Sequence, residues 1–164
     1  MSMIGNLLRV TKTELSAYLQ DSSLLEDSIY DEDSENDKLV DIDKSWDAII
    51  FLLTGQSFAT SQHNLARVLF SGQLIDEEQD LGYGPAHYLN PEQVAELNNE
   101  ISHISMADLK ERFDAKKMTE LEVYPAIWDD EEEAFDYVAE EFLTVQNVFA
   151  EATKNGEAII TFLN

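Results

Sequence analysis

This 164-residue chain holds three histidines and no cysteine, which excludes thiolate metal sites and a cysteine nucleophile and leaves three imidazoles as candidate bases or metal ligands beside its carboxylates. His63, His87 and His103 are too scattered along the sequence to form a metal-binding motif. His87 follows a glycine-rich turn, Gly82-Tyr83-Gly84-Pro85, and binding residues are common beside such loops. Two interpretations of His87 stay open, a ligand-binding residue and a histidine packed in a strand.

Two acidic patterns resemble metal sites but lack essential members. The run Asp31-x-Asp33-x-Glu35-x-Asp37 alternates carboxylates as a calcium loop does, yet Asn36 replaces the turn glycine and Ile42 replaces the bidentate glutamate. Glu100-x-x-His103 has the spacing of a di-iron helix, but the chain has no second copy. No Walker, dinucleotide-binding or nucleophile-elbow pattern occurs. The sequence therefore predicts no metal, no cofactor and no catalytic residue, and it leans against an enzyme.

Aromatic residues near the glycine-rich turn and in two other segments could line a groove. The candidate ligand-binding residues are Trp46, Tyr83, His87 and Tyr124. The alternative is that these rings are ordinary core residues, since aromatic side chains dominate protein interiors.

Acidic residues outnumber basic ones by 34 to 10, which gives a formal charge of −24. Most of the excess lies in three segments, residues 21–43, 76–80 and 129–141. Such a field repels nucleic-acid phosphates and anionic membranes, and it attracts basic protein surfaces. We therefore expect no binding to nucleic acid or membrane, and a basic protein as partner. The candidate partner-binding residues are Glu131, Glu132, Glu133 and Trp128.

The composition predicts one domain over residues 1–164. Hydrophobic residues make up 44% of the chain, which is enough to form a core despite the charge. The absence of cysteine fits the reducing cytoplasm. The first ten residues lack the pattern of a signal peptide, and the longest apolar run, residues 48–53, is too short to span a membrane.

Periodicity and capping signals predict the elements of the first half. Residues 3–10 read as a strand, and Thr11-Lys12-Thr13-Glu14 as a capping box that begins a short helix. Residues 21–41 are acidic and rich in Ser and Asp, so we expect a mobile loop with at most a turn of helix. Residues 45–54 are apolar nearly all round, which predicts a central helix that ends at Gly55.

The second half combines strand pieces with helices. Strand pieces are expected at 67–70, 74–75 and 86–89, and Asn90-Pro91-Glu92-Gln93 is a helix start. Residues 122–128 read as an edge strand or an irregular segment because Pro125 lies inside them. Residues 129–154 carry an apolar stripe typical of a long helix, and residues 158–163 predict a buried last strand.

Two blocks resemble a bacterial family known as YfbM-like, a domain of unknown function. They are Ser45-Trp46-Asp47-Ala48-Ile49-Ile50-Phe51-Leu52-Leu53-Thr54-Gly55 and Leu81-Gly82-Tyr83-Gly84-Pro85-Ala86-His87-Tyr88-Leu89-Asn90-Pro91-Glu92-Gln93-Val94. The similarity runs the full length and includes Met3-Ile4-Gly5 and Val123-Tyr124-Pro125. The resemblance implies a single-domain three-layer α/β/α sandwich with a mixed sheet. It implies no established activity, so it transfers no catalytic residue.

Three hypotheses of function follow. The first is a non-enzymatic intracellular binding protein whose acidic surface engages a basic protein, an immunity- or antitoxin-like role being its sharpest version. The second is a small-ligand binder or enzyme with a pocket near the Gly-Tyr-Gly-Pro turn. The third is a halophile-like or housekeeping globule whose charge is merely adaptive. The sequence does not decide the oligomeric state.

Overall fold

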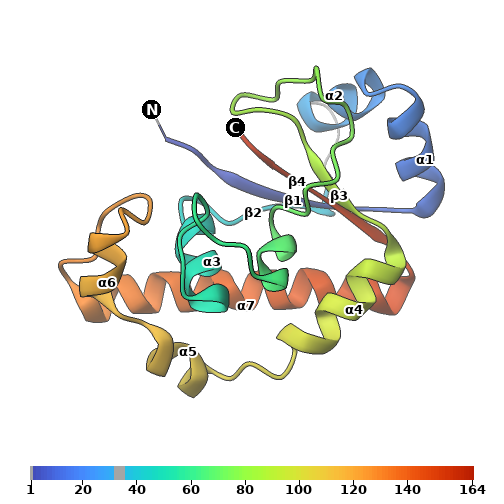
Figure 1. Cartoon of the computed structure of the whole chain (residues 1–164). Helices are drawn as coiled ribbons and strands as arrows, with labels where there is room; N and C mark the ends of the chain where they lie inside the picture. Colours follow the sequence, from blue (N-terminus) through green and yellow to red (C-terminus); the bar gives the residue numbers. More distant parts are fainter. Residues whose placement is uncertain (1, 32–35) are drawn as a thin grey trace.

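A four-stranded antiparallel sheet organises the chain. The computed structural model describes residues 2–31 and 36–164. The strands are β1 (Gly5–Val10), β2 (Leu39–Asp41), β3 (His87–Leu89) and β4 (Ala158–Leu163). Their order across the sheet is β2-β1-β4-β3, so the first and last long strands of the chain pair in the middle (Figure 1). The register places Leu8 opposite Ile160.

Both faces of the sheet are apolar. Successive side chains of a strand point to opposite faces, and each of the two central strands contains successive apolar residues. Leu7 and Ile159 belong to one core cluster, whereas their neighbours Leu8 and Ile160 belong to another. Two hydrophobic cores therefore lie on opposite faces of the same sheet, and the alternating pattern of residues 158–163 buries both faces.

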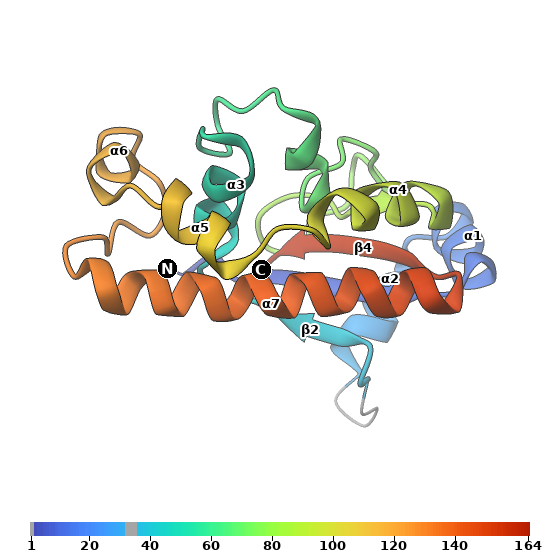
Figure 2. The same cartoon turned by 90° about the horizontal axis from the view of Figure 1, so that it is seen from below.

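The larger core lies between the sheet and three helices. These are α3 (Trp46–Thr54), α4 (Pro91–Ile101) and α7 (Glu131–Asn155). The long helix α7 lies below the strands in Figure 1 and runs in front of them along most of the molecule in Figure 2. The buried stripe of α7 includes Val138, Phe142, Val145 and Phe149, which recur at intervals of three or four residues. Gly156 adopts a left-handed conformation and ends this helix.

The smaller core lies under α1 (Lys12–Gln20), α2 (Ser23–Tyr30) and the loop before β3. The capping box of Thr11 and Glu14 begins α1 as the sequence predicts. Leu25 anchors α2, since its side chain is fully buried. Helices thus pack on both faces, but one face is covered partly by loop, and a regular three-layer sandwich is not confirmed.

Three short helices complete the chain: the 3-10 helix η1 (Asn64–Val68), α5 (Met106–Arg112) and α6 (Ala115–Glu120). They connect α3, α4 and α7 around the larger core (Figure 1). None of the helices in residues 2–31 and 36–164 is both long and apolar enough to cross a membrane.

The structure corrects several expectations. The sheet is antiparallel at every described pairing, so the expected mixed sheet is wrong. Residues 64–68 form η1 instead of a strand at 67–70, because His63 caps the turn by accepting a hydrogen bond from the Leu65 N–H. Leu74 forms an isolated bridge with His87 instead of a strand. Residues 122–128 are irregular, as one of the two expectations had it.

The acidic segment 21–41 is not one continuous loop. It contains α2 and the edge strand β2, and the expectation of a loop is wrong for both. Tertiary contacts explain α2, since the Ser22 hydroxyl donates to Asp76 and the Gln79 amide donates to the Ser22 carbonyl. The middle of the calcium-like run, residues 32–35, lies outside the described residues.

We predict that Phe142→Ala lowers the free energy of unfolding by about 3–5 kcal/mol, because it removes a ring that is fully buried in the larger core. Urea titration measures the loss. The matched control is Leu143→Ala on the same helix, whose side chain is 44% exposed and should change the free energy little. Equal losses in the two variants would contradict this assignment of the core.

Candidate functional site

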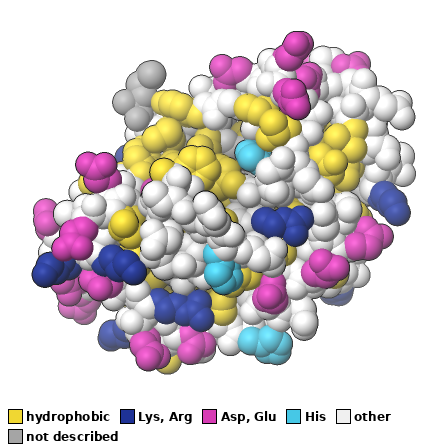
Figure 3. All heavy atoms as spheres, viewed as in Figure 1, with side chains coloured by type: hydrophobic (Ala, Val, Ile, Leu, Met, Phe, Trp, Pro, Cys, Tyr) yellow, Lys and Arg dark blue, Asp and Glu magenta, His cyan; other side chains and the backbone are white. Residues whose placement is uncertain are grey.

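A largely apolar pocket of about 340 Å³ opens where the start of β1 and the end of β4 meet the loops before β3. Three of the four predicted ligand-binding residues, Trp46, Tyr83 and His87, line it together. The other lining residues share apolar side chains and come from the strand ends and two loops: Met3, Phe58, Phe70, Pro85, Phe162 and Leu163. We call this hollow the aromatic pocket. Figure 3 shows hydrophobic side chains gathered on this face of the molecule, with acidic ones around its margin.

Trp46 is the central ring of the pocket. Its side chain packs edge-on against Phe58 and Phe70, with ring centroids 5.8 and 5.7 Å apart. Its indole N–H donates to the Met3 carbonyl over 2.9 Å, which fixes the ring plane. Because Trp46 is only 4% exposed, it forms the floor of the pocket, whereas Phe58 and Tyr83 stand at the rim.

Tyr124 lies beside the pocket and does not line it. Its ring stacks on Trp46 at a centroid distance of 5.3 Å, and its hydroxyl accepts a hydrogen bond from the Met3 N–H. The predicted group of four is therefore close together in space, with three members in the wall and Tyr124 supporting the indole from behind.

A buried carboxylate positions two of the loops around the pocket. Asp47 is 5% exposed and accepts hydrogen bonds from the Phe58 N–H at 2.6 Å and the Tyr124 N–H at 3.0 Å. Burial raises the pKa of Asp47, and the two backbone donors oppose that shift. Asp47 thus links α3 to segments that lie 11 and 77 residues further along the chain.

His87 presents a hydrogen-bond donor. Its Nδ1 accepts from the Gly72 N–H over 3.1 Å, and burial lowers the pKa of the imidazole. The neutral ring therefore carries its proton on Nε2. The ring also packs edge-on against Phe70. Both earlier interpretations of His87 describe part of its environment, since it lies in β3 and lines the pocket.

The glycine-rich turn holds Tyr83 at the rim. The Asp80 carboxylate accepts hydrogen bonds from the N–H groups of Gly82 and Gly84, which lower its pKa. Gly82 has a φ of 134°, and a Cβ atom there would lie 3.0 Å from the Cα atom of Asn164. Glycine is required at this position because the turn passes so close to the end of β4.

The predicted partner-binding residues do not share one surface. Glu131, Glu132 and Glu133 are exposed in the first turn of α7. Trp128 is 2% exposed, and its indole N–H donates to the Val123 carbonyl, so a partner would not reach it in this structure. Glu131 and Glu132 line one hollow, and Glu133 lines another on a different side of the helix.

The comparisons with known proteins agree on one family. A family model described as a domain of unknown function, DUF1877, matches residues 1–162. The chain belongs to the DUF1877 family. Protein YfbM of Escherichia coli strain K12 is 29% identical over 135 residues, which cover 80% of this chain and 78% of YfbM.

A solved structure supports the fold of this DUF1877 domain. It is titled as the crystal structure of a protein of unknown function, YfbM from Escherichia coli, and it matches with a TM-score of 0.77. The match covers 98% of this chain and 99% of the other at 19% identity. It confirms the YfbM-like resemblance and the fold, and it assigns no activity.

Two aromatic walls of the pocket in this DUF1877 domain, Phe58 and Phe70, are not indicated by any pattern in the sequence. Phe58 and Phe70 lie 4.4 Å apart by ring centroid, although Phe58 comes from an irregular loop and Phe70 lies two residues after the end of η1. Neither segment has a periodic pattern that predicts its direction. In the described ranges, no group of three or more His, Asp or Glu side chains could hold a metal ion.

We predict that Asp47→Ala lowers the free energy of unfolding by about 2–3 kcal/mol, because two N–H groups lose their acceptor. It should also shift the tryptophan emission of the chain, since the Phe58 and Tyr124 loops that pack on Trp46 lose their link to α3. Urea titration and tryptophan fluorescence measure the two effects. The control is Asp129→Ala, which removes an exposed carboxylate. A loss no larger than in the control would refute the positioning role.

Proposed function

We propose that this DUF1877 domain is a non-enzymatic binding protein whose aromatic pocket receives a compact, uncharged apolar group. The observation that carries the proposal is the convergence of Trp46, Tyr83 and His87 on one hollow of about 340 Å³. Binding pockets commonly combine apolar walls with a few placed polar groups, at volumes of roughly 300–1,000 Å³. The expected absence of a cofactor and the cytoplasmic location remain part of this proposal.

The polar groups at the pocket favour binding over catalysis. His87 Nδ1 is occupied by the Gly72 N–H, so the neutral imidazole is a donor and not a base toward the pocket. The nearest buried carboxylate, Asp47, is occupied by two backbone N–H groups. Among the described lining residues no hydroxyl or thiol stands beside a free base.

The same groups define the ligand. Ring edges and faces of Trp46 and Phe70 favour a flat apolar group, and burial disfavours a charge there. The Nε2–H of His87 favours one hydrogen-bond acceptor on the ligand, such as a carbonyl oxygen. An aryl ketone combines these features, with acetophenone as the simplest probe.

We predict that acetophenone causes saturable NMR shifts of the Trp46 indole, and that cumene, which lacks the carbonyl, binds about fivefold more weakly. His87→Phe should remove this preference, because it removes the donor and keeps a ring. The matched control is His103→Phe, at an exposed histidine outside the pocket. No saturable shift at Trp46, or an unchanged preference in His87→Phe, would overturn the proposal.

A basic protein is the second candidate ligand, and the exposed first turn of α7 favours it. Glu131, Glu132 and Glu133 follow Asp130, and the described residues form no ion pair with any of the four. Unpaired carboxylates on a rigid helix attract a cationic surface over a distance of about 8–10 Å at physiological salt. An immunity- or antitoxin-like role is the specific form of this proposal.

We predict that reversing Glu131, Glu132 and Glu133 to Lys slows association with such a partner more than it speeds dissociation. The measurement is a pull-down from the host lysate at two salt concentrations with both baits, followed by binding kinetics of the recovered protein. We expect the unmodified bait to recover a basic protein at low salt. The charge-reversed bait, and either bait at high salt, should not recover it. Equal recovery by the two baits would remove the helix start from the interface.

A further inference from the structure

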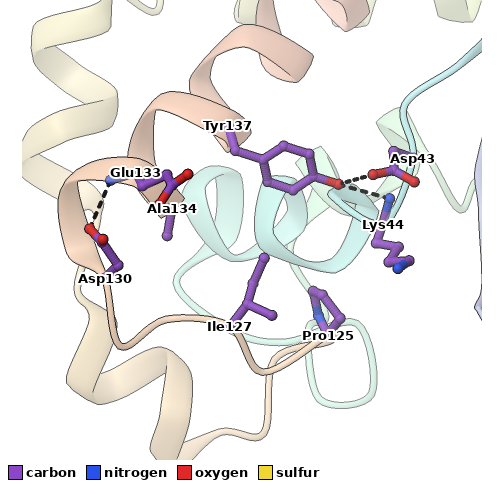
Figure 4. Close-up of a pocket in the computed structure, with 8 residues that line it drawn as sticks. All are labelled: Asp43, Lys44, Pro125, Ile127, Asp130, Glu133, Ala134 and Tyr137. Atoms are coloured by element: carbon purple, nitrogen blue, oxygen red, sulfur yellow. Dashed lines mark hydrogen bonds between the residues drawn. The ribbon is translucent and has the colours of Figure 1, made fainter.

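A second hollow of about 560 Å³ lies between the start of α7 and the loop that follows Tyr124 (Figure 4). Its apolar part is formed by Pro125, Ile127, Ala134 and the ring of Tyr137. Carboxylates of Asp43, Asp130 and Glu133 surround that part. We call this hollow the α7 groove. Since Ile127 is 50% exposed, the groove offers apolar surface that nothing within the described chain covers.

Tyr137 gives the groove a fixed aromatic wall. Its hydroxyl donates to an oxygen of Asp43 over 2.7 Å and accepts from the Lys44 N–H over 3.0 Å. Burial, followed by the hydrogen bond to Asp43, raises the pKa of Tyr137, so the phenol keeps its proton and stays neutral. The ring is therefore held as an uncharged platform, and Figure 4 shows it above Ile127 and Pro125.

The electrostatic environment of the groove is negative. One turn beyond Tyr137, burial and the charges of Asp41, Glu140 and Asp43 raise the pKa of Glu141. The Asp130 carboxylate accepts from the Glu133 N–H and so caps the positive end of the α7 dipole. The single cation among the lining residues is Lys44, which forms no ion pair with a described carboxylate.

We propose that the α7 groove receives an arginine side chain of a basic partner protein. An arginine combines an aliphatic stem, which fits Ile127 and Pro125, with a planar cation, which stacks on Tyr137 and pairs with the carboxylates of Glu133 and Asp43. The argument is charge complementarity around an exposed apolar surface. The inference rests on the proposed engagement of a basic protein, and it is independent of any ligand in the aromatic pocket.

The three neighbouring glutamates at the start of α7 would contribute differently to binding of the arginine. Glu133 lines the groove, whereas Glu131 and Glu132 line a separate hollow with Lys110 and Phe113. The site would therefore depend on Glu133 and not on the total charge of the first turn. Lys44 would oppose the incoming cation, so its removal should strengthen binding.

The test is an NMR titration of the whole chain, labelled at the isoleucine methyl groups, with Nα-acetyl-arginine amide. The neutral isostere Nα-acetyl-citrulline amide is the control ligand. We expect saturable shifts of Ile127 with the arginine amide and weaker binding of the citrulline amide. Glu133→Gln should weaken the arginine amide by roughly two- to fivefold, and Lys44→Gln should strengthen it by a similar factor. Glu132→Gln is the matched control on the same turn and should leave the affinity unchanged.

Three outcomes would overturn the groove assignment: equal binding of the two amides, no shift at Ile127, or equal effects of Glu133→Gln and Glu132→Gln. Equal effects of the two substitutions would indicate that the arginine amide responds to the total negative charge at the start of α7 and not to the groove. The proposed engagement of a basic protein fails in a different way. If the arginine amide binds at Ile127 but the pull-down recovers no basic protein, the groove assignment stands and the protein partner is refuted. If a basic protein is recovered and its affinity is unchanged in Glu133→Gln, the protein partner stands and the groove assignment is refuted.

Discussion

The carboxylate of Asp47 is the constraint on which the functional surface depends. It is buried at the start of α3 and accepts one N–H from the loop of Phe58 and one from the loop of Tyr124. Neither loop has regular structure of its own at these residues, so their positions follow from this acceptor and from packing on Trp46. The two hydrogen bonds offset the cost of burying this carboxylate, and losing them would leave two N–H groups without an acceptor. The carboxylate is therefore a rigid link between distant segments.

The two hollows are neighbours because of the same link. Trp46 forms the floor of the aromatic pocket, and Tyr124 stacks behind it. The next residue, Pro125, already lines the α7 groove, and Lys44 lies two residues before Trp46. The two hollows therefore draw lining residues from the same two segments of the chain, around Trp46 and around Tyr124. A ligand that moved the Tyr124 loop would affect both sites.

Local signals in the sequence predicted the regular elements and three of the residues in the pocket. Capping boxes marked the starts of α1 and α4, and period-two alternation marked β4, because both signals depend on adjacent residues. The strand directions and the helix α2 could not be read in this way. Leu25 is buried only because α2 packs on the smaller core, where the Ser22 hydroxyl also reaches Asp76. The position of Phe58 likewise depends on Asp47, which precedes it by 11 residues.

The acidic residues divide into those with a hydrogen bond or ion pair that supports the fold and those without such a contact among the described residues. Asp80, Asp108 and Asp114 accept backbone N–H groups in turns and helix caps, and Glu157 pairs with Arg9 and Lys38. The hydrogen bonds and ion pairs of these carboxylates stabilise the fold, which explains their presence without any ligand. The side chains of Glu131, Glu132 and Glu133 form no such contact in the described structure, and they exceed what the dipole of one helix start requires. The start of α7 therefore carries three adjacent carboxylates without an ion pair among the described residues, and Glu133 lines the groove that contains Tyr137.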